Sequence, residues 1–284
     1  AIMNAAGTWM WNNRTHGELK WTTIETEHFN IHYHQNLDKI AIQGASIAEQ
    51  IRPTLMKQMG LESLPTLDII FTAEDEVLNG FAVPANYTII WVDQNDAALW
   101  TGDEKWLRTV LAHELQHLVY FNTVKGPWWL PEPMNSLVHG TPAWIVEGIA
   151  EYFTEEWRPF RYELSHRYHV LRNTVHKIQD PHNDGYSKSL YLADRFGDST
   201  ISKILNHRNK LKFLDFKESF KKHTGITLKQ FNEDWRRQMN TFYFSQRSQK
   251  ERLEDAGVIR KLPIKRVLSF DYFQDTSRVA MITR

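Results

Sequence analysis

The sequence contains no cysteine in its 284 residues. Disulfide bonds and thiolate metal ligands are therefore excluded, and any zinc site must use histidine, aspartate or glutamate. No apolar run approaches the roughly 20 residues that a membrane-spanning helix needs, so we expect no membrane span. An excess of charge of one sign is also missing, because lysine plus arginine and aspartate plus glutamate number 34 each. This balance gives no indication of a nucleic-acid surface, and we expect no nucleic-acid partner.

The segment before residue 125 predicts a small sheet. Alternating apolar residues indicate a strand at 29–34, and helical spacing over 37–59 indicates a helix that ends at Gly60. Two short apolar runs, 66–71 and 87–92, indicate further strands. The order strand, helix, strand, strand favours a mixed sheet with a helix packed on it.

Helical patterns dominate after residue 100. One helix is expected over 101–122, and another starts with Thr141 as N-cap and Pro142 at its first position. Further helices are expected at 161–178, 186–196, 201–209, 214–223 and 228–246. The end of the chain, 266–282, predicts a β-hairpin with a turn at 274–277, which is marginal by itself. It either packs onto the body or starts a β-rich domain beyond residue 284.

The pentapeptide His113-Glu114-Leu115-Gln116-His117 reads H-E-x-x-H inside the helix expected over 101–122. Histidines four residues apart lie on one helical face, so both imidazoles can reach one ion, with Glu114 beside a water on that ion. Apolar neighbours would bury this face, which is costly for histidines that lack a partner. The motif therefore predicts a zinc hydrolase, and the alternative is a polar patch on an amphipathic helix.

A catalytic zinc needs a third protein ligand and one open position. The extended pattern H-E-x-x-H-x-x-G-x-x-H is excluded, because Tyr120 and Thr123 stand where glycine and histidine should be. A deformylase-like arrangement needs a cysteine. The remaining class takes a glutamate from a second helix downstream, and W-I-V-E-G-I-A-E at 144–151 offers Glu147. The alternative for Glu147 and Glu151 is a solvated acidic face.

With these two motifs the chain resembles the gluzincin metallopeptidases, which include thermolysin-like and aminopeptidase N-like enzymes, and in particular the peptidase MA-like family. That family pairs H-E-x-x-H with a W-x-x-E-G-x-A-E helix. The resemblance covers roughly 21–246 and implies His113, His117 and Glu147 as ligands of Zn²⁺, with Glu114 as the general base. It also implies that Glu151 hydrogen-bonds the ligand His113 and orients its ring.

The fold that this resemblance implies is α+β and thermolysin/gluzincin-like. We expect a mixed α/β lobe over 1–125 that ends in the motif helix, a helical lobe over 126–260, and a hairpin segment over 261–284. The active-site cleft would lie between the two lobes. The resemblance also implies that the protein is secreted, periplasmic or located at the cell surface.

The implied reaction is hydrolysis of a peptide or protein substrate. Glu114 would take a proton from a zinc-activated water and return it to the leaving amine. Tyr186 is the first candidate for the oxyanion donor, followed by Tyr191 and His182. The family commonly binds substrate along a sheet edge, which we expect at 87–92.

The preceding segment, 80–84, lacks the acid of the G-x-M-E-N motif in aminopeptidase N-like enzymes, which favours an endopeptidase. Two other functions stay open: a zinc-fold binding or scaffold module without turnover, and a zinc hydrolase of a non-peptide bond. His32 with His34, and His166 with His169, are interpreted as exposed polar pairs rather than metal sites. Trp128 and Trp129 either line a specificity pocket or serve packing.

Overall fold

A computed structural model of the chain describes both regions that carry the two motifs. The described residues are 17–74, 79–92, 104–124, 129–130, 134–135, 139–154, 160–175, 180–207, 216–251, 255, 257–258, 261, 263–264, 266–272 and 278–283. The helix start expected at residue 101, the hairpin turn at 274–277 and Trp128 lie outside them. The chain up to Asn240 and the segment Thr241–Arg284 form two separate compact units. The division expected at residues 125 and 260 stays a prediction.

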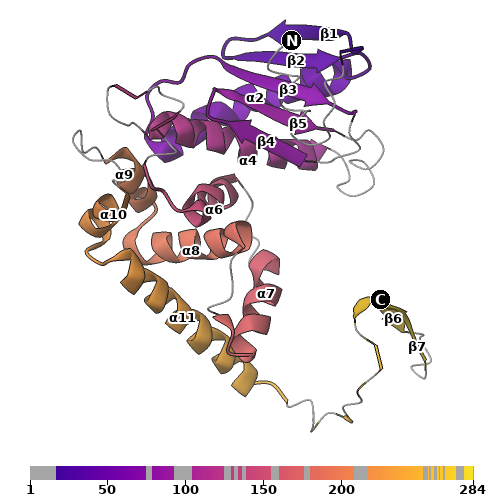
Figure 1. Cartoon of the computed structure of the whole chain (residues 1–284), viewed down its shortest axis with the longest axis vertical. Helices are drawn as coiled ribbons and strands as arrows, with labels where there is room; N and C mark the ends of the chain where they lie inside the picture. Colours follow the sequence, from indigo (N-terminus) through magenta and orange to yellow (C-terminus); the bar gives the residue numbers. More distant parts are fainter. Residues whose placement is uncertain are drawn as a thin grey trace. The chain divides into compact units, whose positions relative to one another are not determined.

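The first unit begins with a five-stranded mixed sheet of order β1-β2-β3-β5-β4, as Figure 1 shows. The strands are β1 (Trp21–Glu25), β2 (Phe29–His34), β3 (Leu67–Thr72), β4 (Asn79–Val83) and β5 (Tyr87–Trp91). β2, β3 and β5 run parallel, whereas β1 pairs antiparallel with β2 and β4 pairs antiparallel with β5. The mixed sheet predicted from the sequence is confirmed.

The prediction that 87–92 forms the sheet edge is wrong. β5 is an interior strand, since it pairs with β3 on one side and with β4 on the other, and β4 is the edge. A tight turn after Val83 reverses the chain, and Asn86 adopts a left-handed conformation there, with φ of 64°. Such turns close hairpins, so the residues before the turn fold back onto the outer side of β5.

Two long helices pack on one face of this sheet. α2 (Asp38–Met59) ends at Gly60, whose φ is 69° and whose amide donates to the Lys57 carbonyl, as the sequence predicted. α4 (Glu104–Thr123) carries the H-E-x-x-H motif and lies beside β4 and α2 (Figure 1). The main apolar core lies between these helices and the sheet and continues into the helices that follow in the chain. A smaller cluster covers the opposite sheet face and is formed by Ile70, Tyr87, Ile89 and Trp91.

The helical part of the first unit contains α6 (Ala143–Thr154), α7 (Phe160–Leu171), α8 (Pro181–Phe196), α9 (Ser199–Asn206), α10 (Phe216–Thr224) and the start of α11 (Leu228–Ser248). α8 begins at Pro181, earlier than the expected residue 186. Asp180 caps it, because its side chain accepts hydrogen bonds from the amides of His182 and Asn183. This earlier start places His182 on the helix.

α6 and α8 approach each other closely enough for their backbones to touch. A Cβ atom built at Gly148 would collide with the Gly185 carbonyl and would lie 2.6 Å from Ser189 Oγ. A Cβ atom at Gly185 would meet the Trp144 carbonyl and lie 2.8 Å from the Gly148 nitrogen. Only glycine allows this approach, so the pair sets the distance between the two helices.

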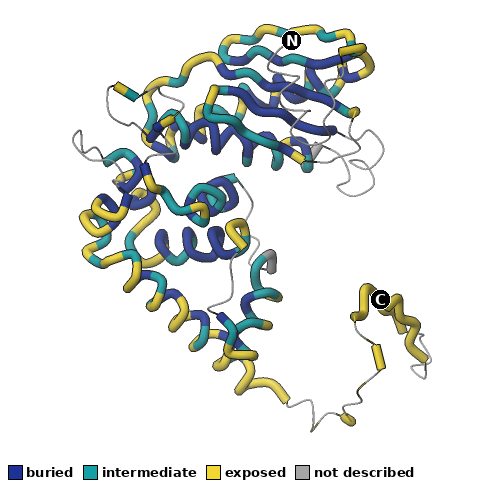
Figure 2. The backbone as a smooth tube through the Cα atoms, viewed as in Figure 1, coloured by how far each residue is buried: buried dark blue, intermediate teal, exposed yellow. Residues whose placement is uncertain are grey.

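The second compact unit contains a β-hairpin. β6 (Val267–Tyr272) pairs antiparallel with β7 (Val279–Thr283), with an irregularity between Val267 and Ser269. The expected strands are therefore present. Every residue of both strands is exposed, whereas buried residues concentrate in the sheet, α4, α6 and α8 (Figure 2). Within the described ranges, no helix is long and apolar enough to cross a membrane.

We predict that Gly148→Ala destabilises the protein by about 1–3 kcal/mol, because the added methyl forces α6 and α8 apart. Gly17→Ala is the matched control, since its methyl would meet no atom within 4 Å. Urea unfolding of both variants measures the difference. Equal stability of the two variants would contradict the close helix approach.

Candidate metal centre

Three ligand atoms from two helices converge on one point. α4 presents the Nε2 atoms of His113 and His117, which lie 3.2 Å apart. α6 presents Glu147, whose Oε2 lies 3.5 Å from His113 Nε2 and 3.3 Å from His117 Nε2. A tetrahedral zinc with bonds of 2.0–2.1 Å places its ligand atoms about 3.3 Å apart. The three separations therefore fit one face of a zinc tetrahedron.

This cluster is largely shielded from solvent, with 14% of the His113 side chain and 9% of the His117 side chain exposed. Burial alone would raise the pKa of Glu147, but hydrogen bonding with His113 and His117 outweighs it and holds that pKa well below its usual range. Burial would likewise lower the pKa of His113, yet the contact with Glu147 and the charges of Glu114 and Glu151 raise it. The surroundings therefore favour an ionised Glu147 next to a positive charge, and a bound cation would supply that charge.

Glu114 follows His113 on α4 and is 6% exposed. Its carboxylate rests against Gly80 of the edge strand. Burial raises its pKa, although the nearby His117 and His113 oppose the shift. A carboxylate with a raised pKa is better matched to proton transfer near neutral pH.

Glu151 lies one turn after Glu147 on α6 and is 1% exposed. Its Oε1 is 3.0 Å from His182 Nδ1 and 3.8 Å from His113 Nδ1. The first distance is a hydrogen bond, whereas the second exceeds one. The orienting bond from Glu151 to His113 stays a prediction, and the structure shows a hydrogen bond between Glu151 and His182.

His182, which lies on α8, is also next to the cluster. Its ring stacks on His113, with centroids 5.7 Å apart, and its Nδ1 lies 3.5 Å from Glu147 Oε2. About half of its side chain is exposed, more than for either histidine of α4. The sequence suggested His182 as an oxyanion donor but missed its bond to Glu151. The Asp180-Pro181 pair signals a helix start and would have placed His182 on α8.

In the part of the chain that the structure describes, a second group also has metal-ligand spacing: His113, Glu151 and His182. Its separations are uneven, at 3.0 Å and 3.8 Å, and the shorter one is already a hydrogen bond. The group of His113, His117 and Glu147 fits zinc better.

The two tyrosines suggested as oxyanion donors lie in different places on α8. Tyr186 is buried one turn after His182, and its ring packs edge-on against Tyr162 at 5.6 Å. Tyr191 lies five residues after Tyr186 on α8, and its hydroxyl accepts a hydrogen bond from Arg195 at 2.8 Å. Its ring packs against Phe231 of α11, with centroids 5.4 Å apart, so Tyr191 lies at the contact of α8 with α11. The role of Tyr186 stays a prediction.

Two histidines interpreted as exposed are buried, so that interpretation is wrong for them. His34 is 3% exposed, and its Nε2 accepts the amide of Ala73 at 3.1 Å. His166 is fully buried beside Trp235, and burial lowers its pKa to about 4. A neutral imidazole packs as an aromatic ring when backbone groups satisfy a nitrogen, which spacing along the sequence does not reveal. Trp129 is 56% exposed.

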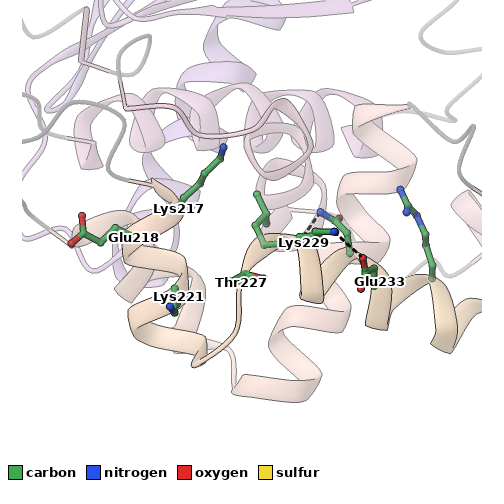
Figure 3. A pocket seen from close by; sticks show the side chains of 9 residues that line it. Lys217, Glu218, Lys221, Thr227, Lys229 and Glu233 are labelled. Atoms are coloured by element: carbon green, nitrogen blue, oxygen red, sulfur yellow. Dashed lines mark hydrogen bonds and ion pairs between the residues drawn. The ribbon is translucent and has the colours of Figure 1, made fainter.

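Figure 3 shows a separate hollow between α10 and α11. Its lining mixes cations with carboxylates, and Lys229 Nζ lies 4.0 Å from Glu233 Oε1. None of the residues of the metal cluster lines it. Exposed charges of both signs at such a surface indicate no specific ligand.

Comparison with known proteins gives matches among solved structures. No protein-family model matches the chain, and no curated protein does. Among solved structures, the chain is similar to an aminopeptidase N family protein from Idiomarina loihiensis, with 14% identity and a TM-score of 0.48. The match covers 77% of this chain and 46% of that chain, so this chain spans about half the length of that protein. A likeness this distant supports no functional inference, and the geometry of the site carries the argument.

We predict that Glu147→Gln lowers zinc affinity by more than about a hundredfold, beyond the loss expected from removing a group that only supports a ligand. The amide replaces the charged oxygen that completes the three-atom cluster. His32→Ala is the control, since this histidine contacts Thr23 and Asp68 on the sheet. Competition with a chromogenic chelator measures both affinities, and unchanged binding by Glu147→Gln would contradict the site.

Proposed function

We propose that this protein is a zinc-dependent metallopeptidase of gluzincin type that hydrolyses peptide bonds. The observation that carries the proposal is the convergence of His113 Nε2, His117 Nε2 and Glu147 Oε2 within 3.5 Å of one another. A buried glutamate stands next to this cluster in the chain, on the same helix.

The residues present fit a catalytic zinc ion. Two imidazoles and one carboxylate would hold it, which is the ligand set of a zinc site that keeps one position open. No thiolate is needed, in agreement with the absence of cysteine. When bound, zinc would supply an activated water and polarise the scissile carbonyl.

Glu114 is the proposed general base. It would take the proton of the attacking water and hand it to the leaving amine, which requires a carboxylate that alternates between its two protonation states. Its buried position and raised pKa favour that alternation. Tyr186 is kept as a proposed donor to the oxyanion, and His182 is the donor candidate for which the structure shows a contact with the cluster.

The proposed substrate is a peptide or protein, and we favour internal cleavage. β4 carries Asn-Gly-Phe-Ala-Val, which contains no acidic side chain to bind a free amino terminus. A secreted, periplasmic or cell-surface location belongs to the proposal and is supported by the sequence resemblance alone.

We predict that Glu114→Gln keeps zinc and loses peptide cleavage by about 10²–10⁴-fold, because the amide cannot accept the proton. Glu27→Gln is the control, since the Glu27 side chain is 84% exposed. Mass spectrometry of a digested peptide library gives the rates, and elemental analysis gives the zinc content.

The outcomes of this experiment separate the candidate functions. Cleavage by Glu114→Gln at the rate of the unmodified protein would contradict the role of Glu114 as general base. A zinc-loaded protein that cleaves no peptide would favour a binding or scaffold module. Turnover of ester or amide substrates alone would favour a hydrolase of a non-peptide bond.

A further inference from the structure

The edge strand β4 touches the side chain of Glu114 through a residue that has no side chain of its own. Successive residues of a strand point to opposite faces of a sheet. Phe81 and Val83 pack into the small cluster on the sheet face away from the helices. Gly80 and Ala82 therefore face α4, beside which β4 lies (Figure 1).

Gly80 leaves the space that the Glu114 side chain occupies. A Cβ atom at Gly80 would lie 2.6 Å from Glu114 Oε1 and 2.7 Å from Glu114 Cδ, well inside van der Waals contact. The three nearest atoms to that position all belong to Glu114. The backbone itself does not require glycine, since Gly80 has no positive φ. The need for glycine comes from Glu114.

The wall that Gly80 forms consists of main-chain atoms of an edge strand, which are held by pairing with β5. This wall limits where the Glu114 carboxylate can lie on the side of β4.

We propose that Gly80 is a positioning residue for Glu114: it keeps the carboxylate at the place from which it transfers the proton. This inference rests on the proposed function, because it assigns Gly80 a part in that reaction. The Glu114 side chain is flexible, so a larger residue at position 80 displaces the carboxylate and leaves the strand in place. Misplacement of a reacting group by about 1 Å costs roughly a hundredfold in rate.

The first test compares the kinetics of Gly80→Ala with those of the unmodified protein. We expect kcat to fall by about a hundredfold while KM and zinc content stay close to their original values. Gly17→Ala adds the same methyl to open space and is expected to keep the full rate. A crystal structure of metal-free Gly80→Ala should show the Glu114 carboxylate moved away from β4.

A second test needs no activity. Glu114→Ala removes the atoms that a methyl at position 80 would meet. In the metal-free protein, Gly80→Ala should therefore lower the unfolding temperature when Glu114 is present and leave it unchanged in the Glu114→Ala background. This non-additivity reports direct contact between the two side chains, and it stays measurable if Gly80→Ala alone folds poorly.

The outcomes distinguish this inference from the proposed function. Full kcat for Gly80→Ala, together with an inactive Glu114→Gln, would overturn the positioning role and leave the peptidase proposal standing. Additive effects on the unfolding temperature would also overturn it. An active Glu114→Gln would instead overturn the proposed function.

Discussion

The proposed chemistry depends on the convergence of two imidazole nitrogens and one carboxylate oxygen in a space that is largely shielded from solvent. Such a cluster is costly without a positive charge to satisfy it, because burial removes the water that would otherwise solvate each group. The pKa of Glu147 is held low, and the pKa of His113 is raised, by their mutual contact. A divalent cation would supply the missing positive charge, and the observed separations of the three ligand atoms fit a cation that prefers tetrahedral coordination.

Backbone contacts at glycines place the groups around this cluster. Gly148 and Gly185 let α6 and α8 touch, which brings His182 against Glu151 and Glu147. Gly80 lets β4 touch the side chain of Glu114. A methyl group at Gly148 or Gly185 would push α6 and α8 apart, and a methyl group at Gly80 would displace the Glu114 carboxylate. Close backbone approach, rather than long side chains, therefore defines the dimensions of the site.

The local parts of this account were predictable from the sequence. His113 and His117 share a helical face through their spacing alone, and Glu147 and Glu151 do so on the next helix. The order of strands was not predictable, since β4 becomes the edge only because β5 pairs with β3 on its other side. The bond between His182 and Glu151 and the burial of His166 are likewise products of tertiary packing. The start of α8 was readable from Asp180-Pro181, and it was missed.

The central claim is that zinc binds at His113, His117 and Glu147. X-ray absorption spectroscopy of the protein loaded with one equivalent of zinc tests it most directly, in parallel with the His182→Ala variant. The account predicts two imidazole ligands and one carboxylate at about 2.0–2.2 Å, with one further light ligand and an unchanged spectrum for His182→Ala. A spectrum that loses an imidazole ligand in His182→Ala would contradict it and would place the metal at His113, Glu151 and His182.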